Sequence, residues 1–363
     1  MFLVYPISFL AYFIVAEKLN FKKVSFKVLF GIFILINFIT LFLPSVSSDD
    51  LSSYIFWSRL FSRFGANPYF DVYDGFQADP LYSSLATVWS GKPSVYGPLF
   101  TLMGSGLTAL AGDSLFLNFF LFKLTFASLV VLTGWLIYKI TQSNLALFLF
   151  AANPVIVWEL MLDRHNEIVL IFLLVLGLAA KDYLKGWAAL ILSGLIKFTT
   201  LILLPFYGFF ALKNLKKKRF RFILAAGLLA LGLTLLTHLP FWTGQDMYAR
   251  IGLVSGAQYP YPSPGILALS VFLPFTSARL ASRVIFLGLY VLILVRFAGL
   301  KKISQDHLIG YSLFVLTAFL GLYLTLILPW YLTTLVALAA ILRRRIFLYL
   351  VSVSAILIHF LIA

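Results

Sequence analysis

The chain has 363 residues, of which 62% are hydrophobic, 17% are aromatic and only 11% are charged, and its mean hydropathy is +1.00. This composition excludes a soluble globular protein, so the formal net charge of +15 indicates basic loops beside a membrane and no nucleic-acid partner. The chain contains no cysteine, so no disulfide constrains its loops.

Apolar runs of about 20 residues, the length that crosses a bilayer, recur along the whole sequence. They predict an all-α fold, a single polytopic transmembrane helical bundle over residues 1–363 with about 11 or 12 spans. The run of residues 1–16 lacks a basic n-region, and Glu17 and Lys18 follow it in place of a small-residue cleavage site. We therefore expect a retained span and not a signal peptide. The long polar loop of residues 45–98 is expected to carry short helices.

Basic residues lie in short clusters between the apolar runs, and such clusters face the cytoplasm. These clusters fall within residues 18–27, 181–185, 213–221, 301–302 and 343–345. Alternation between them places residues 45–98, 163–167 and 329–331 together on the outer face. Residues 99–111 are short and rich in Gly and Thr, which suggests a re-entrant or half-crossing helix. Residues 186–212 predict two short helices that meet near Lys197.

The outer loop opens with two adjacent carboxylates, Asp49 and Asp50. If Asp50 begins a helix, Tyr54 and Trp57 share its face at positions i+4 and i+7. A carboxylate at the edge of the hydrocarbon is costly unless the site uses it, so we interpret Asp50 as an active-site acid. Capping of the helix is the competing structural role, and one residue can serve both.

Further motifs follow in a fixed order. They are D-x-x-x-Y-x-x-x-x-R from Asp50 to Arg59, G-x-N-P-Y with Asn67 and Tyr69, Y-G-P-L from Tyr96, N-P at Asn153, H-N-E with His165, Asn166 and Glu167, the lysine Lys197, and P-W-Y with Trp330 and Tyr331. The set resembles the GT-C glycosyltransferases, and within them the polyprenol-phosphate-dependent mannosyltransferases, including the bacterial α-1,6-mannopyranosyltransferases. Two positions depart from the family pattern. Ser58 replaces a Gly, and Glu167 replaces an Asp.

The resemblance implies an enzyme that moves a hexose, with mannose expected, from a polyprenyl-phosphate donor to a glycan, glycolipid or protein acceptor. The expected place is the outer face of a prokaryotic plasma membrane. Phosphate departs as a stable anion, so one base is enough for an inverting single displacement. Asp50 is the expected base, and Asp49, which lacks the Tyr and Arg at the family spacing, is the alternative. No cofactor is expected, and no divalent metal, because adjacent acids lack chelating spacing.

Cations are expected to stabilise the departing phosphate. The candidates are Arg59, Arg63, Arg164, Lys197 and Arg250, among which Arg59 has the motif position and Lys197 interrupts an apolar run. Snorkelling at the interface is their competing role. His165, Asn166 and Glu167 are expected to contact sugar or phosphate. The predicted substrate-binding set also includes Tyr54, Asn67, Tyr69, Tyr96, Trp330 and Tyr331, although an interfacial aromatic belt is the alternative for most aromatics on this face.

Two other classes of protein stay open at this point. A transporter or lipid flippase would show two related halves with broken helices near mid-membrane, a symmetry that this sequence lacks. Another lipid-linked glycan ligase or polymerase would carry its key loop late in the chain, whereas the acidic loop here comes early.

Overall fold

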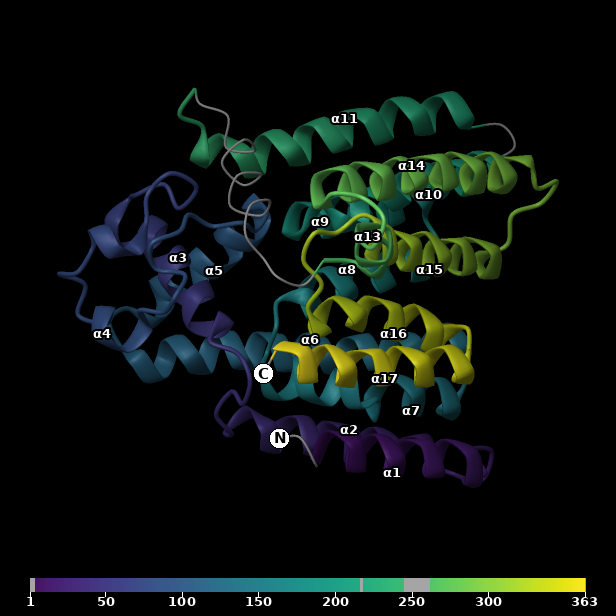
Figure 1. Cartoon of the computed structure of the whole chain (residues 1–363), viewed down its shortest axis with the longest axis horizontal. Coiled ribbons are helices and arrows are strands. Elements are labelled where there is room, and N and C mark those ends of the chain that lie inside the picture. The colour runs from purple at the N-terminus through teal and green to yellow at the C-terminus, as the bar shows by residue number, and fades with distance from the viewer. Residues whose placement is uncertain (1–3, 216–217, 245–261, 363) are drawn as a thin grey trace.

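The computed structural model describes residues 4–215, 218–244 and 262–362. Within these ranges all regular secondary structure is helical and there is no strand, which confirms the predicted all-α bundle. The longer helices run side by side along one direction, while α3, α4 and α5 gather at one end of the bundle (Figure 1).

The described residues form helical elements that are separated by turns and loops. In chain order they are α1 (Val4–Lys18), α2 (Phe26–Leu41), α3 (Asp50–Phe64), η1 (Tyr73–Gly75), α4 (Tyr82–Leu85), α5 (Pro98–Ala111), α6 (Leu115–Thr141), α7 (Asn144–Ala151), η2 (Ile156–Leu162), α8 (Glu167–Ala179), α9 (Tyr183–Ile196), η3 (Phe198–Leu203), α10 (Leu204–Asn214), α11 (Arg219–His238), η4 (Leu239–Phe241), α13 (Pro264–Ser270), α14 (Phe275–Gly299), α15 (Gln305–Leu322), η5 (Pro329–Leu332), α16 (Thr333–Ile341) and α17 (Arg345–Ile362).

The outer surface of the bundle is apolar, as in a protein that contacts lipid. Ile7, Leu228, Leu280 and Val295 are each more than half exposed. Among the described residues, three helices (α6, α14, and α11 together with η4) are long and apolar enough to cross a membrane, or four if the bent pair of α7 and η2 is one span. Seven shorter apolar segments accompany them, and the total of 11 or 12 spans stays a prediction.

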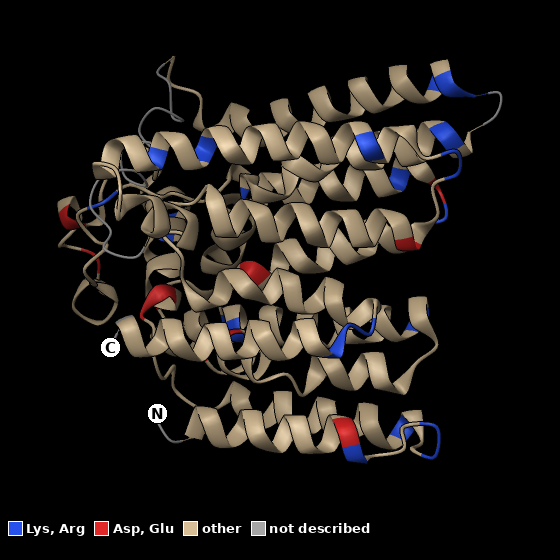
Figure 2. Cartoon of the chain, turned by 45° about the vertical axis from the view of Figure 1, so that its right-hand side comes forward, with Lys and Arg blue, Asp and Glu red and all other residues tan. Residues whose placement is uncertain are grey.

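Charge is distributed unevenly along the bundle. Most Lys and Arg residues gather at the helix ends opposite α3, α4 and α5 (Figure 2). Asp and Glu are found mainly at the other end and inside the bundle (Figure 2). The basic clusters predicted from the sequence therefore share one end of the molecule.

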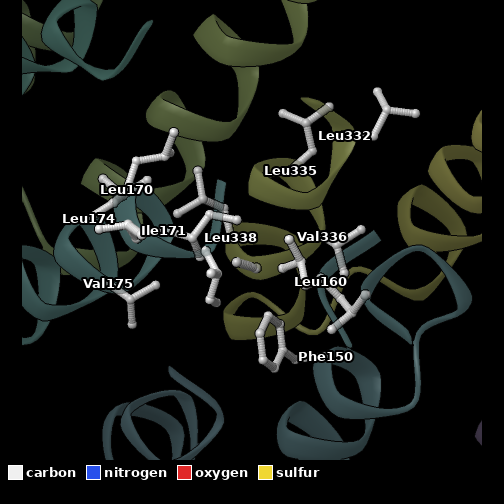
Figure 3. Packing of buried hydrophobic residues seen from close by; sticks show 14 of the residues in the cluster. Phe150, Leu160, Leu170, Ile171, Leu174, Val175, Leu332, Leu335, Val336 and Leu338 are labelled. Atoms are coloured by element: carbon white, nitrogen blue, oxygen red, sulfur yellow. The ribbon is translucent and has the colours of Figure 1, made fainter. Parts of the chain in front are cut away.

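The interior is packed from helices that are distant in sequence. Phe150 of α7, Leu160 of η2, Ile171 of α8 and Val336 of α16 are fully buried and lie close to one another (Figure 3). Since lipid tails are as apolar as these side chains, close packing holds such helices together more than water exclusion does. Polar contacts add to it. Asn153 Nδ2 donates to Ser352 Oγ of α17 at 3.1 Å.

Two breaks interrupt the helical rods. The axis bends by 67° between α7 and η2, where Asn153 Oδ1 accepts from Val155 N at 3.0 Å and Pro154 cannot donate an N–H. The second break is at Lys197, which is extended (φ −153°, ψ 124°) between α9 and η3. The prediction of two short helices meeting near Lys197 is confirmed. Residues 99–111 form the predicted short helix, α5.

Helix α3 carries the first motif and packs tightly on α5. It ends at Gly65, whose left-handed conformation (φ 62°) lets Ala66 N donate to Leu60 O at 2.9 Å. At its centre, a Cβ added to Gly104 of α5 would meet Ser58 Oγ at 2.1 Å. Ser58, the departure from the family pattern, therefore occupies space that Gly104 leaves open.

Candidate active site

Asp50 and Asp49 differ sharply in their surroundings. Asp49 is exposed at the N-cap of α3, and its side chain makes no capping hydrogen bond. Asp50 is 8% exposed, and its Oδ2 accepts a long hydrogen bond from Tyr54 OH at 3.4 Å. Tyr54 OH in turn accepts from Asn166 N at 3.3 Å. The i, i+4 spacing thus produces the contact that the sequence predicted, and it favours Asp50 over Asp49 as the acid inside the site.

His165 lies against Asp50 and is completely buried. Its Nδ1 is 3.3 Å from Asp50 Oδ2, and its ring stacks on Trp330 with centroids 3.9 Å apart. Burial alone would lower the pKa of His165, but the carboxylates of Asp50, Glu159 and Glu167 raise it above its ordinary value. The nearby carboxylates therefore stabilise the charged form of the imidazole.

Lys197 forms the second polar centre. Its Nζ donates to Glu167 Oε1 at 2.5 Å and lies 4.0 Å from the centre of the Tyr331 ring and 5.9 Å from that of Tyr96. The Tyr96 ring is also 5.3 Å from the Tyr54 ring. Tyr96 and Tyr54 thus connect the lysine with the Asp50 centre.

An apolar cavity of about 90 Å³ begins at this lysine. Its polar lining comes from Glu167, Lys197, Thr199, Tyr331 and Thr334. The remainder is lined by leucine and phenylalanine side chains of α8, α15, α16 and the segment after α15, namely Leu170, Leu316, Phe319, Leu320, Leu324 and Leu335. The ammonium of Lys197 therefore lies at the polar part of a cavity whose remaining lining is apolar.

The Y-G-P motif attaches the outer loop to the break at Lys197. Gly97 N donates to Ile196 O at 2.8 Å, and a Cβ at Gly97 would lie only 2.1 Å from Leu195 O. Only glycine allows this approach, so the close contact explains the residue between Tyr96 and Pro98.

Similarity to known proteins covers the part of the chain that holds most of these residues. A family model described as alpha-(1->6)-mannopyranosyltransferase, N-terminal domain, matches residues 7–213, or 207 of the 363 residues. The matched part contains Asp50, His165 and Lys197. The chain belongs to the alpha-(1→6)-mannopyranosyltransferase family.

Individual relatives share less than a third of their residues with the chain. Alpha-(1->6)-mannopyranosyltransferase A of Corynebacterium glutamicum is 28% identical over 174 residues, which cover 46% of this chain and 35% of the relative. The enzyme of the same name from Mycobacterium tuberculosis is 26% identical over 216 residues, covering 57% and 42%. The match thus spans about two fifths or less of the length of these relatives. No solved structure matches the chain.

Arg59, predicted to bind the donor phosphate, lies away from the Asp50 centre. Nine residues along a helix separate them by about 13 Å, and the Arg59 side chain is 1% exposed. Its Nε and Nη2 donate to Asp79 at 2.8 and 2.5 Å, while Nη1 donates to Gly112 O and Nη2 also reaches Asp113 Oδ1. In this structure the guanidinium joins α3 to the outer loop and to the connection between α5 and α6.

The ion pair with Arg59 changes the pKa of Asp79. Burial alone would raise the pKa of Asp79, but hydrogen bonds from Arg59, Leu81 N and Tyr73 lower it below its usual value. Asp79 therefore stays ionised through the neutral and mildly acidic range.

Other predicted residues also make structural contacts. Asn67 Nδ2 donates to Phe241 O at 2.8 Å, and Tyr69 OH lies 2.9 Å from Thr101 Oγ1. Arg164 donates to Asn37 and to Thr40 Oγ1 of α2 at 2.9 Å. The structure does not bring these contacts into the Asp50 centre. Arg63 pairs with Asp113 at the surface, and Arg250 lies outside the described residues.

Two residues behind His165, Glu159 and His359, were not among the predicted site residues. Glu159 Oε2 lies 3.5 Å from His165 Nε2, and Glu159 Oε1 is 2.6 Å from His359 Nε2 of α17. The available signal was an acid within an apolar run, which is rare without a function. The sequence offered no corresponding sign for His359, which is 200 residues away.

Asp163 completes this group, because one ligand-type atom each of Glu159, Asp163 and His165 lies within 4.8 Å of the others. However, Asp163 already accepts from Val46 N, Ser47 N and the Ser47 hydroxyl, and Glu159 is engaged by His359. We therefore interpret the group as a hydrogen-bonded network that ties the start of the outer loop to the connection after η2. That no divalent metal is required stays a prediction.

Proposed function

We propose that the protein transfers mannose from a polyprenyl-phosphate donor to a hydroxyl of a glycan, glycolipid or protein acceptor. The observation that carries the proposal is one buried carboxylate, Asp50, linked through tyrosine rings to a lysine at an apolar cavity. Membership of a mannosyltransferase family supports transfer over transport.

The cavity suits the two chemical parts of such a donor. A polyprenyl chain is hydrocarbon, and the leucine and phenylalanine lining offers it an apolar surface. The phosphate carries negative charge, for which Lys197 is the cation at this cavity. Lys197 is paired with Glu167, so the phosphate would share or replace that carboxylate as the counter-charge of the lysine.

Asp50 would take the proton from the acceptor hydroxyl as that oxygen attacks the anomeric carbon of the sugar. The carbon–oxygen bond to phosphate breaks on the opposite side, so the configuration inverts. Phosphate leaves with the electron pair, and Lys197 stabilises the charge that develops on it. The sugar hydroxyls would meet Asn166, whose amide oxygen and nitrogen have no hydrogen-bond partner among the described residues.

Replacing the lysine tests the donor site. Lys197→Met keeps the length of the side chain but removes its charge, so transfer from labelled polyprenyl-phosphate mannose should fall by roughly 10²-fold, the scale for losing one charge-stabilising group. Lys123→Met is the matched control, because Lys123 also interrupts an apolar helix but donates to Leu43 O. Equal activity of the two variants, or transfer from a nucleotide sugar alone, would contradict the proposed donor site.

The site is proposed to face the outside of a prokaryotic plasma membrane. The cysteine-free chain allows a direct check with single cysteines. Val88→Cys, at an exposed position of the outer loop, should react with an impermeant maleimide added to intact cells, whereas Lys302→Cys at the basic end should react only after lysis. The reverse pattern would place the site in the cytoplasm.

A further inference from the structure

His165 lies between two carboxylates that come from different parts of the chain. Asp50 Oδ2 of α3 is 3.3 Å from Nδ1, and Glu159 Oε2 of η2 is 3.5 Å from Nε2. His165 and Glu159 are completely buried, and Asp50 nearly so. Stacking on Trp330 fixes the plane of the imidazole, so its two nitrogens face two acids at once.

Glu159 has no role in the transfer as described above. Its Oε1 is held by His359 Nε2, while its Oε2 has no hydrogen-bond partner among the described residues and is the oxygen nearest His165. A carboxylate inside an apolar bundle is expensive to keep unless it is used. Glu159 lies on the far side of His165 from Asp50, which suggests that it exchanges a proton with that histidine.

We propose that Glu159 completes a proton relay, Asp50–His165–Glu159, and that His359 holds the Glu159 carboxylate in position for it. The proposal rests on the proposed function, in which Asp50 receives the acceptor's proton. Glu159 and His359 act through His165 and do not touch the substrate, so they are positioning residues.

The relay begins with two carboxylates on either side of an imidazolium. When the acceptor's proton arrives on Asp50, the imidazolium loses the negative charge that balanced it. In the same step it passes its Nε2 proton to Glu159 Oε2. All three groups are now neutral, and the negative charge has left with the phosphate. After the products depart, Asp50 releases its proton to water and Glu159 returns its proton to His165.

The charged groups around the relay are compatible with these proton transfers. A cation left without a counter-charge in a buried site is unfavourable, so protonation of Asp50 favours transfer to Glu159. The titratable and charged groups that act on these three residues from the surrounding elements are Tyr5, Tyr54, Tyr96, Asp163, Glu167, Lys197, Tyr331 and His359.

The protonation of His165 can be followed directly, because the chain contains only four histidines. In the full-length protein with ¹⁵N-labelled histidine, Glu159→Gln keeps the shape of the side chain but removes one of the two acids that face the ring. The pH at which His165 loses its proton should fall by about one unit or more. Glu17→Gln is the control, because Glu17 pairs with Arg345 far from this group and should leave His165 unchanged.

Kinetics separate a relay from a merely structural role. Glu159→Gln should lower kcat by roughly 10- to 100-fold, on the scale of other supporting-residue changes, and leave the KM for the donor nearly unchanged. It should also change the shape of the pH–rate profile. The wild-type enzyme provides a test without any mutation. Two protons moving together should make its rate a curved function of the deuterium fraction in mixed H₂O and D₂O.

Distinct results count against the two proposals. A wild-type chain that transfers nothing overturns the proposed function. Normal wild-type transfer with a linear deuterium dependence, or an unchanged His165 titration in Glu159→Gln, overturns the relay alone. If Glu159→Gln does not fold, the deuterium dependence of the wild type decides the matter.

Discussion

Asp50→Asn should lower mannose transfer by roughly 10²-fold or more while the protein still folds and binds the donor. The change keeps the size of the side chain and its ability to accept from Tyr54 OH, but it removes the group that receives the acceptor's proton. Turnover of purified protein with labelled donor, together with a thermal unfolding curve, measures both quantities.

Asp49→Asn is the matched control because it makes the same chemical change one residue earlier. Asp49 is exposed and its side chain does not cap α3, so its loss should alter transfer only slightly. If Asp49→Asn abolishes transfer and Asp50→Asn does not, the base has been assigned one residue too late. Two fully active variants would place the base outside this loop.

Arg59→Ala should cause the largest loss of stability among these variants, about 3–5 kcal/mol. The substitution leaves Asp79 buried without its cation and removes the donors to Gly112 O and Asp113. Unfolding in detergent or nanodiscs should therefore occur at a clearly lower temperature. Any fall in transfer should follow the loss of folded protein, because Arg59 lies far from Asp50 along α3.

Arg63→Ala provides the comparison, since Arg63 pairs with the same Asp113 but is 54% exposed. Loss of the Arg63 side chain should lower the free energy of unfolding by at most about 1 kcal/mol.

The contribution of the Arg59–Asp79 pair to the free energy of unfolding should also depend on pH. Because the folded-state pKa of Asp79 is lowered, the stabilisation is present at neutral pH and is lost as the pH falls through the ordinary carboxyl range and then below it. If Arg59→Ala leaves the stability and its dependence on pH unchanged but abolishes transfer, the structural role is wrong and Arg59 acts at the donor site.

Local spacing made part of the site predictable. Asp50 and Tyr54 meet because residues four apart share a helix face, and Trp330 and Tyr331 were predicted from the P-W-Y motif of the resemblance. Lys197 was recognisable because an ammonium rarely interrupts an apolar run without a role. The break around it followed from the length of the run.

Long-range pairing could not be predicted in the same way. Arg59 was predicted to bind phosphate because its partners Asp79 and Asp113 lie 20 and 54 residues away in the sequence, where no local pattern identifies them. Glu159 meets His359 only because η2 and α17 pack at one place in the bundle. A buried ion pair and a ligand-binding cation have the same signature in a sequence, and only the location of the opposing acid separates them.

The contact between Gly97 N and Ile196 O has a mechanical consequence. It joins the segment with Tyr96 to the residue before Lys197, so we expect a displacement at the cavity to reach the ring beside Tyr54. We expect a donor that shifts Lys197 to change the affinity of the Asp50 centre for the acceptor. Since such coupling is reciprocal, the acceptor should change the affinity for the donor by the same factor. We therefore expect the backbone contact of Gly97 to couple the binding of the two proposed substrates.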